Sequence, residues 1–164
     1  MEPNRRRAGP EAILGGRLLA FAGDGDIVGL SQYVTALVYG AAPGDASYDD
    51  VLEWVVTTIA DVITDKIGPI VDSEVDGVTG FAVTLRTPDG IQLAIDDLPA
   101  PERHVWKAIA EVLDGDLPRA HGTLAPVEHG SEPGEQAHAL IEAVSWLDRL
   151  LDLPALNGPY TVPE

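Results

Sequence analysis

The spacing of apolar residues is the feature that most constrains the fold of this chain. It follows a helical period in most segments and changes to a period of two in one segment. The longest helical pattern covers residues 51–67 and carries an apolar arc wide enough to be buried on several sides. Its apolar members are Leu52, Val55, Val56, Ile59, Val62, Ile63 and Ile67. We predict that this segment is a helix at the centre of the core.

Four further segments combine helical spacing with signals for a helix start or end. Pro10 suits a first helical turn, Asp26 and Ser47 can cap a helix N-terminus, and Gly115 can end a helix. We therefore predict a helical hairpin from the first two segments, followed by the central helix and two later helices. The predicted segments other than 51–67 are 12–22, 27–38, 99–113 and 135–151.

The period of two lies between residues 81 and 96 and indicates β structure. Residues 87–90 (Thr-Pro-Asp-Gly) suit a hairpin turn, and pairing across it places Leu85 opposite Leu93. An isolated hairpin is marginal in water, so a third strand over residues 70–75 is expected.

The predicted fold class is α+β, with helices flanking a small antiparallel sheet of two or three strands in the order ααα-βββ-αα. The alternative is a mainly α-helical bundle with a β-hairpin. Residues 116–133 contain three prolines and two histidines and show no period, so we expect a long loop there. We expect a flexible basic tail over 1–9, one globular domain over 10–153 and a C-terminal tail over 154–164.

The chain is strongly acidic, and its charge limits the partners it can have. It has 27 acidic and 10 basic residues, with a formal net charge of −17. Such a field repels phosphate backbones and attracts basic surfaces, so we expect another protein, in particular a basic one, as partner and no direct nucleic-acid binding. Self-association through an apolar face is a related expectation. No run of 18 apolar residues occurs, which predicts no membrane span.

Cysteine is absent, which removes disulfides, thiolate metal sites and cysteine nucleophiles. Together with the missing membrane span, this composition favours a cytoplasmic protein. The chain also lacks a G-x-S-x-G elbow, a phosphate loop and an H-E-x-x-H pair. We therefore expect no cofactor, and enzymatic activity is the less favoured class.

Asp72, Glu74 and Asp76 resemble the first half of a calcium loop because alternate side chains carry oxygen ligands. The twelfth position of that loop, which should supply a bidentate acid, is Val83. A polar strand that ends in an Asp-Gly turn explains these residues more simply.

The histidines provide the other metal candidates. Glu135, His138 and Glu142 share one face of a predicted helix, and His121, Glu128 and His129 in the predicted loop could join them around zinc. No second E-x-x-H motif supports a bundle metal site, so a solvated helix face is the simpler interpretation. Paired acids such as Asp49-Asp50 are explained by helix capping.

The leading functional hypothesis is a non-catalytic acidic module for protein interaction or regulation. One alternative is a small hydrolase-like enzyme that uses Asp or Glu with His121, His129 or His138. Another is an acidic nucleic-acid mimic that inhibits a DNA-binding protein, which requires the charges to form a stripe. A cleft with clustered histidines and carboxylates would favour an enzyme, and an apolar patch rimmed by acids would favour binding.

Overall fold

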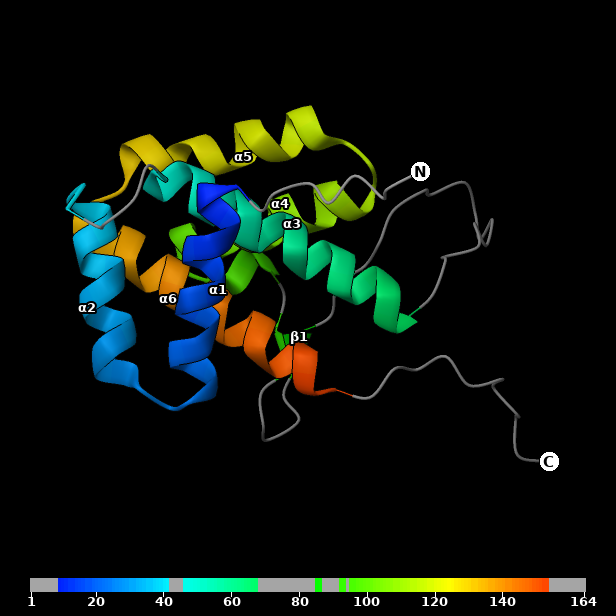
Figure 1. Ribbon diagram of the computed structural model, residues 1–164. Coiled ribbons are helices and arrows are strands. Elements are labelled where there is room, and N and C mark those ends of the chain that lie inside the picture. The colour runs from blue at the N-terminus through cyan, green and yellow to red at the C-terminus, as the bar shows by residue number, and fades with distance from the viewer. Residues whose placement is uncertain (1–8, 42–45, 68–84, 87–91, 94, 154–164) are drawn as a thin grey trace, which may run out of the picture.

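The computed structural model describes residues 9–41, 46–67, 85–86, 92–93 and 95–153, and most of them are helical (Figure 1). The six α-helices of this part of the chain are α1 (Pro10–Gly23), α2 (Ile27–Val38), α3 (Tyr48–Ile67), α4 (Ala100–Leu113), α5 (Leu117–Gly130) and α6 (Pro133–Asp152). A ladder of β1 (Leu85–Arg86) and β2 (Gln92–Leu93) precedes the 3₁₀ helix η1 (Ile95–Asp97).

Local capping interactions explain where several of these helices begin and end. Asp26 accepts a hydrogen bond from the backbone N–H of Gly29 at 2.9 Å and thereby caps α2. Gly25 and Gly115 adopt positive φ values of 71° and 82° in the turns after α1 and α4, a conformation that favours glycine. The five helices expected from the sequence are confirmed, with small changes at their ends.

Helices α3 and α6 form the centre of the bundle. Helix α3 contacts α1, α4, α5 and α6, and α6 contacts the five other helices. The α1–α2 hairpin and the α4–α5 pair both pack on this centre, and α1 and α2 are steeply inclined to α5 (Figure 1). Leu52 and Ile59 of α3, with Leu140 and Leu147 of α6, are fully buried. The prediction that residues 51–67 are central to the core is confirmed.

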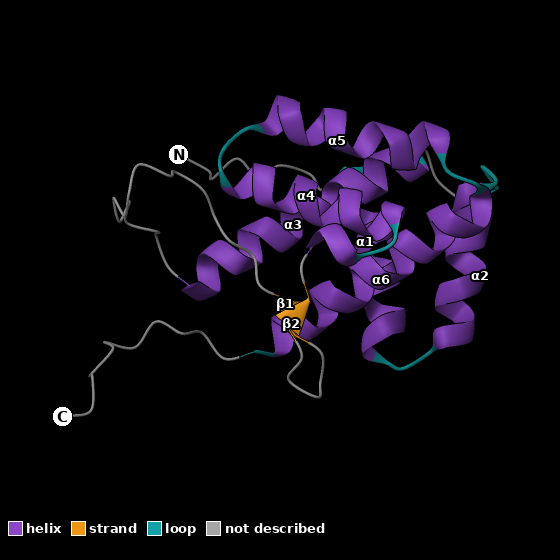
Figure 2. Ribbon diagram, turned by 180° about the vertical axis from the view of Figure 1, so that it is seen from behind, coloured by secondary structure: helices purple, strands orange, loops and turns teal. Residues whose placement is uncertain are grey.

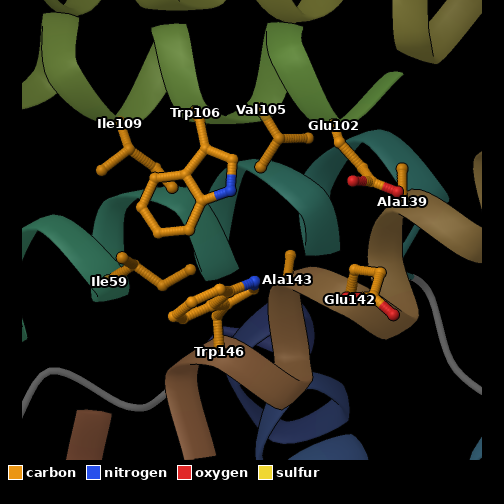
Figure 3. Close-up of a pocket in the computed structure, with 9 residues that line it drawn as sticks. All are labelled: Ile59, Glu102, Val105, Trp106, Ile109, Ala139, Glu142, Ala143 and Trp146. Atoms are coloured by element: carbon orange, nitrogen blue, oxygen red, sulfur yellow. The ribbon is translucent and has the colours of Figure 1, made fainter. Parts of the chain in front are cut away.

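Two tryptophans fill the space between α4, α6 and α3. Trp106 and Trp146 meet edge to face, with ring centroids 5.2 Å apart and ring planes at 87°, and Ile59 lies beside them (Figure 3). The Arg149 guanidinium lies over the Trp146 ring at 5.6 Å from its centroid. The tryptophans thus act in packing.

The α+β prediction is wrong, because the described structure is a helical bundle without a sheet layer. The predicted pairing of Leu85 with Leu93 is present, but among the described residues the ladder has only two residues in each strand. It lies at the edge of the bundle (Figure 2). A described ladder of this size does not form a layer that covers the core. The predicted third strand over 70–75 and both tails, apart from Gly9, lie outside the described residues.

The predicted loop over residues 116–133 is also wrong, because most of it forms α5. Asp116 caps this helix by accepting a hydrogen bond from the Arg119 N–H at 3.2 Å, and Pro118 lies in the first turn, where it is tolerated. Gly122 and Pro126 weaken the local helical signal, since proline removes one hydrogen bond of the helix. Burial of Ala120, Leu124 and Val127 against the bundle compensates for this loss.

We predict opposite effects of adding a methyl group at two neighbouring glycines of α1. A Cβ at Gly15 would overlap the Trp54 ring, whereas a Cβ at Gly16 would meet nothing within 4 Å. Gly15→Ala should lower the free energy of unfolding by about 1–3 kcal/mol through overpacking. Gly16→Ala should raise it by about 0.5–1 kcal/mol, because alanine loses less backbone entropy in a helix.

Urea denaturation of the two variants and the wild type measures both effects. Equal changes for the two variants would show that Trp54 does not pack on Gly15 in solution.

Candidate functional site

Four helix ends meet at one end of the bundle, the C-terminal ends of α2 and α5 and the N-terminal ends of α3 and α6 (Figure 1). The residues at these ends line a cleft of about 390 Å³. The apolar part of the cleft lining comes from Leu37, Val38 and Ala46. The carboxylates come from Asp49 and Glu128. No lysine or arginine is among its described lining residues. The other polar side chains that line it are Ser47, Tyr48, His129 and Gln136.

A reciprocal cap at the start of α3 places the acids on that side of the cleft. The Ser47 hydroxyl accepts a hydrogen bond from the Asp50 N–H at 3.2 Å, and the Asp50 carboxylate accepts one from the Ser47 N–H at 3.4 Å. Asp49 and Asp50 lie in the first helical turn, where the helix dipole favours negative charge. Capping, as expected from the sequence, therefore accounts for Asp50. Asp49 takes no part in this reciprocal cap, and its side chain lines the cleft.

Glu128 comes from α5 and occupies a position that would ordinarily be apolar. With Ala120, Leu124 and Val127 it forms the buried stripe of that helix, at spacings of four, three and one residues. Its side chain is only 3% exposed. The acid is thus held inside the protein by the packing of the helix that carries it.

Hydrogen bonds from α6 and α3 hold this end of α5 in place. The Gln136 side-chain amide donates to the backbone carbonyls of Val127 and Glu128 at 3.2 and 2.8 Å, which satisfies two acceptors at the helix C-terminus. The Tyr48 hydroxyl donates to the Gln136 carbonyl at 2.7 Å. Burial raises the pKa of Tyr48, as do the charges of Glu128 and Asp49, so this hydroxyl keeps its proton.

The environment of Glu128 disfavours its charged form. Burial is the largest cause, followed by the charges of Asp49 and Glu53, a hydrogen bond with Glu53 and the charge of Asp50; together they raise the pKa of Glu128 to about 7. Glu128 also lies near the C-terminus of α5, where the helix dipole is negative. Its Oε1 atom is buried, and none of the described residues forms a hydrogen bond with it.

Two of the predicted histidines lie on α5 beside these acids. His121 Nδ1 is 2.6 Å from Glu53 Oε1, a hydrogen-bond distance. His129 Nε2 is 3.7 Å from Asp49 Oδ2 and 3.9 Å from Glu128 Oε2. One ligand atom from each of Asp49, Glu128 and His129 lies within 4.8 Å of the other two, an arrangement that can hold a metal ion.

The other predicted site residues do not join this group. His138 Nε2 is 2.8 Å from Glu102 Oε1 of α4. Glu135 accepts a hydrogen bond from the Glu132 N–H at 3.2 Å and caps α6. On this face of α6, Glu135 therefore caps the helix and His138 pairs with Glu102 of α4. Asp72, Glu74 and Asp76 lie outside the described residues, so the calcium prediction stays a prediction.

The sequence contains a signal that Glu128 is buried, but the prediction of a loop over 116–133 concealed it. With 117–130 read as a helix, Glu128 falls on the same face as Ala120 and Leu124, and an acid at such a position indicates a special environment. No comparable signal exists for Asp49 and Glu53, because their proximity to α5 results from tertiary packing.

Comparison with protein-family models, with curated proteins and with solved structures gave no match. The site is therefore interpreted from its own geometry. Among the helices that the structure describes, none combines the length and the hydrophobicity that crossing a bilayer requires.

We predict that Glu128 makes the stability of the protein fall as pH rises. The pKa of Glu128 is about 7 in the folded state against an ordinary value of 4.5, so the folded chain binds this proton more tightly. The stabilisation is fully present below pH 4.5 and is lost as pH rises to about 7. The free energy of unfolding should fall by about 3 kcal/mol over this range. Glu128→Gln should remove this part of the pH dependence.

Urea unfolding at pH 5 and pH 8 in the presence of a chelator tests this prediction. Glu142→Gln, a matched change outside the cleft, should keep the wild-type dependence on pH. Retention of the full dependence in Glu128→Gln would contradict the assignment.

Proposed function

We propose that this protein is a non-catalytic acidic interaction module whose cleft receives an arginine or lysine side chain from a basic segment of another protein. The observation that carries the proposal is the composition of the cleft. It combines apolar wall with the carboxylates of Asp49 and Glu128, and no basic side chain is among its described lining residues.

The chemistry of arginine fits these surroundings. Its aliphatic stem can pack against Leu37, Val38 and Ala46, while its guanidinium pairs with the carboxylates beyond them. A cation beside Glu128 favours the charged form of that carboxyl and supplies a donor for its unpaired oxygen. The cleft is thus complementary to a long basic side chain in both shape and charge.

Features outside the cleft support the same kind of partner. Tyr39 follows Val38 and precedes Gly40, both of which line the cleft, and it is 69% exposed. Exposed tyrosines are frequent anchors in protein interfaces. The formal net charge of −17 attracts basic surfaces over long range and accelerates their association.

The arrangement of the polar groups favours binding over hydrolysis. His121 and Glu53 have the spacing of a base and the carboxylate that orients it, but neither lines the cleft. Ser47 does line the cleft, and its hydroxyl is occupied with the cap of α3. The histidine that does line the cleft, His129, lies 3.7 Å from Asp49 and 3.9 Å from Glu128. Both distances are too long for the hydrogen bond by which a carboxylate orients a histidine base.

A labelled deca-arginine peptide provides a direct probe of the proposed binding. We expect it to bind the wild-type protein, with an affinity that falls as salt is added. Asp49→Asn should weaken this binding on the order of tenfold, because one carboxylate that pairs with the cation is removed.

Asp61→Asn is the matched control, since it removes the same charge from an exposed position on the same helix. Fluorescence anisotropy should give nearly the wild-type affinity for this variant. Equal losses in the two variants would mean that the peptide responds only to net charge, and the cleft would then not be the binding site.

A further inference from the structure

We propose that Asp49, Glu128 and His129 form a binding site for a divalent first-row transition-metal ion, of which Zn²⁺ and Mn²⁺ are the representatives. This site goes beyond the interaction with a basic partner and does not depend on it. The ligands come from the first turn of α3 and the last turn of α5, two helix ends that the fold holds together.

The distances between the ligand atoms suit a shared ion better than direct pairing. His129 Nε2 lies 3.7 Å from Asp49 Oδ2 and 3.9 Å from Glu128 Oε2, and both separations are too long for hydrogen bonds. Around a tetrahedral zinc ion with bonds near 2 Å, ligand atoms lie about 3.3 Å apart. The two distances to His129 Nε2 are thus close to the spacing around such an ion, and the Asp49 and Glu128 oxygens lie within 4.8 Å of each other.

A buried oxygen of Glu128 is the second, independent indication of a ligand. The Glu128 side chain is only 3% exposed, and its Oε1 atom has no hydrogen-bond partner among the residues that the structure describes. Buried polar groups are generally hydrogen-bonded or bound to metals. The groups that face this carboxyl from α3 are acids, Asp49, Asp50 and Glu53, which accumulate negative charge without a cation. A divalent ion bound to the Glu128 carboxylate would compensate that charge.

The elements around the site provide the rigidity that a metal centre requires. Gln136 holds the backbone of Glu128 with a hydrogen bond of 2.8 Å, and Tyr48 in turn holds the Gln136 carbonyl at 2.7 Å. Such surrounding hydrogen bonds keep metal ligands oriented. The carboxyl groups can therefore bind an ion without a large rearrangement of either helix.

The ligand types define the class of ion. An imidazole nitrogen with two carboxylate oxygens suits zinc, manganese and related ions, whereas calcium and magnesium prefer oxygen ligands alone. Three protein ligands leave at least one coordination position, and Asp49, Glu128 and His129 all line the cleft. The bound ion would thus be accessible to a further ligand from the cleft.

Isothermal titration of the chelator-treated full chain with Zn²⁺, and separately with Mn²⁺, tests the proposal. We expect one ion per chain at this site. His129→Ala and Asp49→Asn should each weaken the binding on the order of tenfold or more. Both ligand side chains are partly exposed, so circular dichroism should show folded variants.

His121→Ala is the control, because it removes an exposed histidine from the same helix without touching the proposed ligands. This variant should bind zinc with an affinity within about twofold of the wild type. Absence of binding at millimolar Zn²⁺ and Mn²⁺, or binding that His129→Ala leaves unchanged, would overturn the metal site. Neither result would affect the peptide-binding proposal, which the deca-arginine titration tests without metal.

Discussion

Burial of α3 is the constraint on which the rest of the structure depends. Its apolar arc is covered by α1, α4, α5 and α6, and residues such as Val55 and Ile59 have no exposed surface. Burial on several sides also determines where the polar ends of the helix lie. Because α5 packs along α3, the acids in the first turn of α3 come to lie beside the last turn of α5. The cleft is thus a consequence of core packing.

The same packing creates an electrostatic conflict at Glu128. An apolar residue at this stripe position would fit the core, yet the chain places there a carboxyl surrounded by Asp49, Asp50 and Glu53. Burial and like charges both oppose ionisation, so the group must keep its proton or obtain a cation. A proton, a basic side chain and a divalent ion all resolve this conflict. The proposed interaction and the proposed metal site are two ways of supplying the missing positive charge.

The sequence predicted the elements that local signals specify and missed those that depend on distant contacts. Asp26, Ser47 and Gly115 act within a few residues of their own helices, and the corresponding boundaries were predicted well. Helix α5 was missed because Gly122 and Pro126 obscure its pattern, and only burial against the bundle makes it stable. The alternation over 81–96 predicts a sheet, but among the described residues only two from each strand are paired. His121 and His129 were named as candidates, whereas their pairing with Glu53 and Asp49 arises from the packing of α5 near α3.

Glu128 is a buried carboxyl that pairs with no lysine or arginine in the described part of the chain. A carboxyl-carbon NMR titration of the protein, labelled at glutamate and freed of metal, measures this property directly. We expect the Glu128 resonance to titrate with a pKa of about 7, well above its ordinary value of 4.5. Titration of Glu128 near 4.5 would show that its carboxyl is solvated or already paired, and would contradict the assignment of Glu128 as a buried carboxyl that needs a cation.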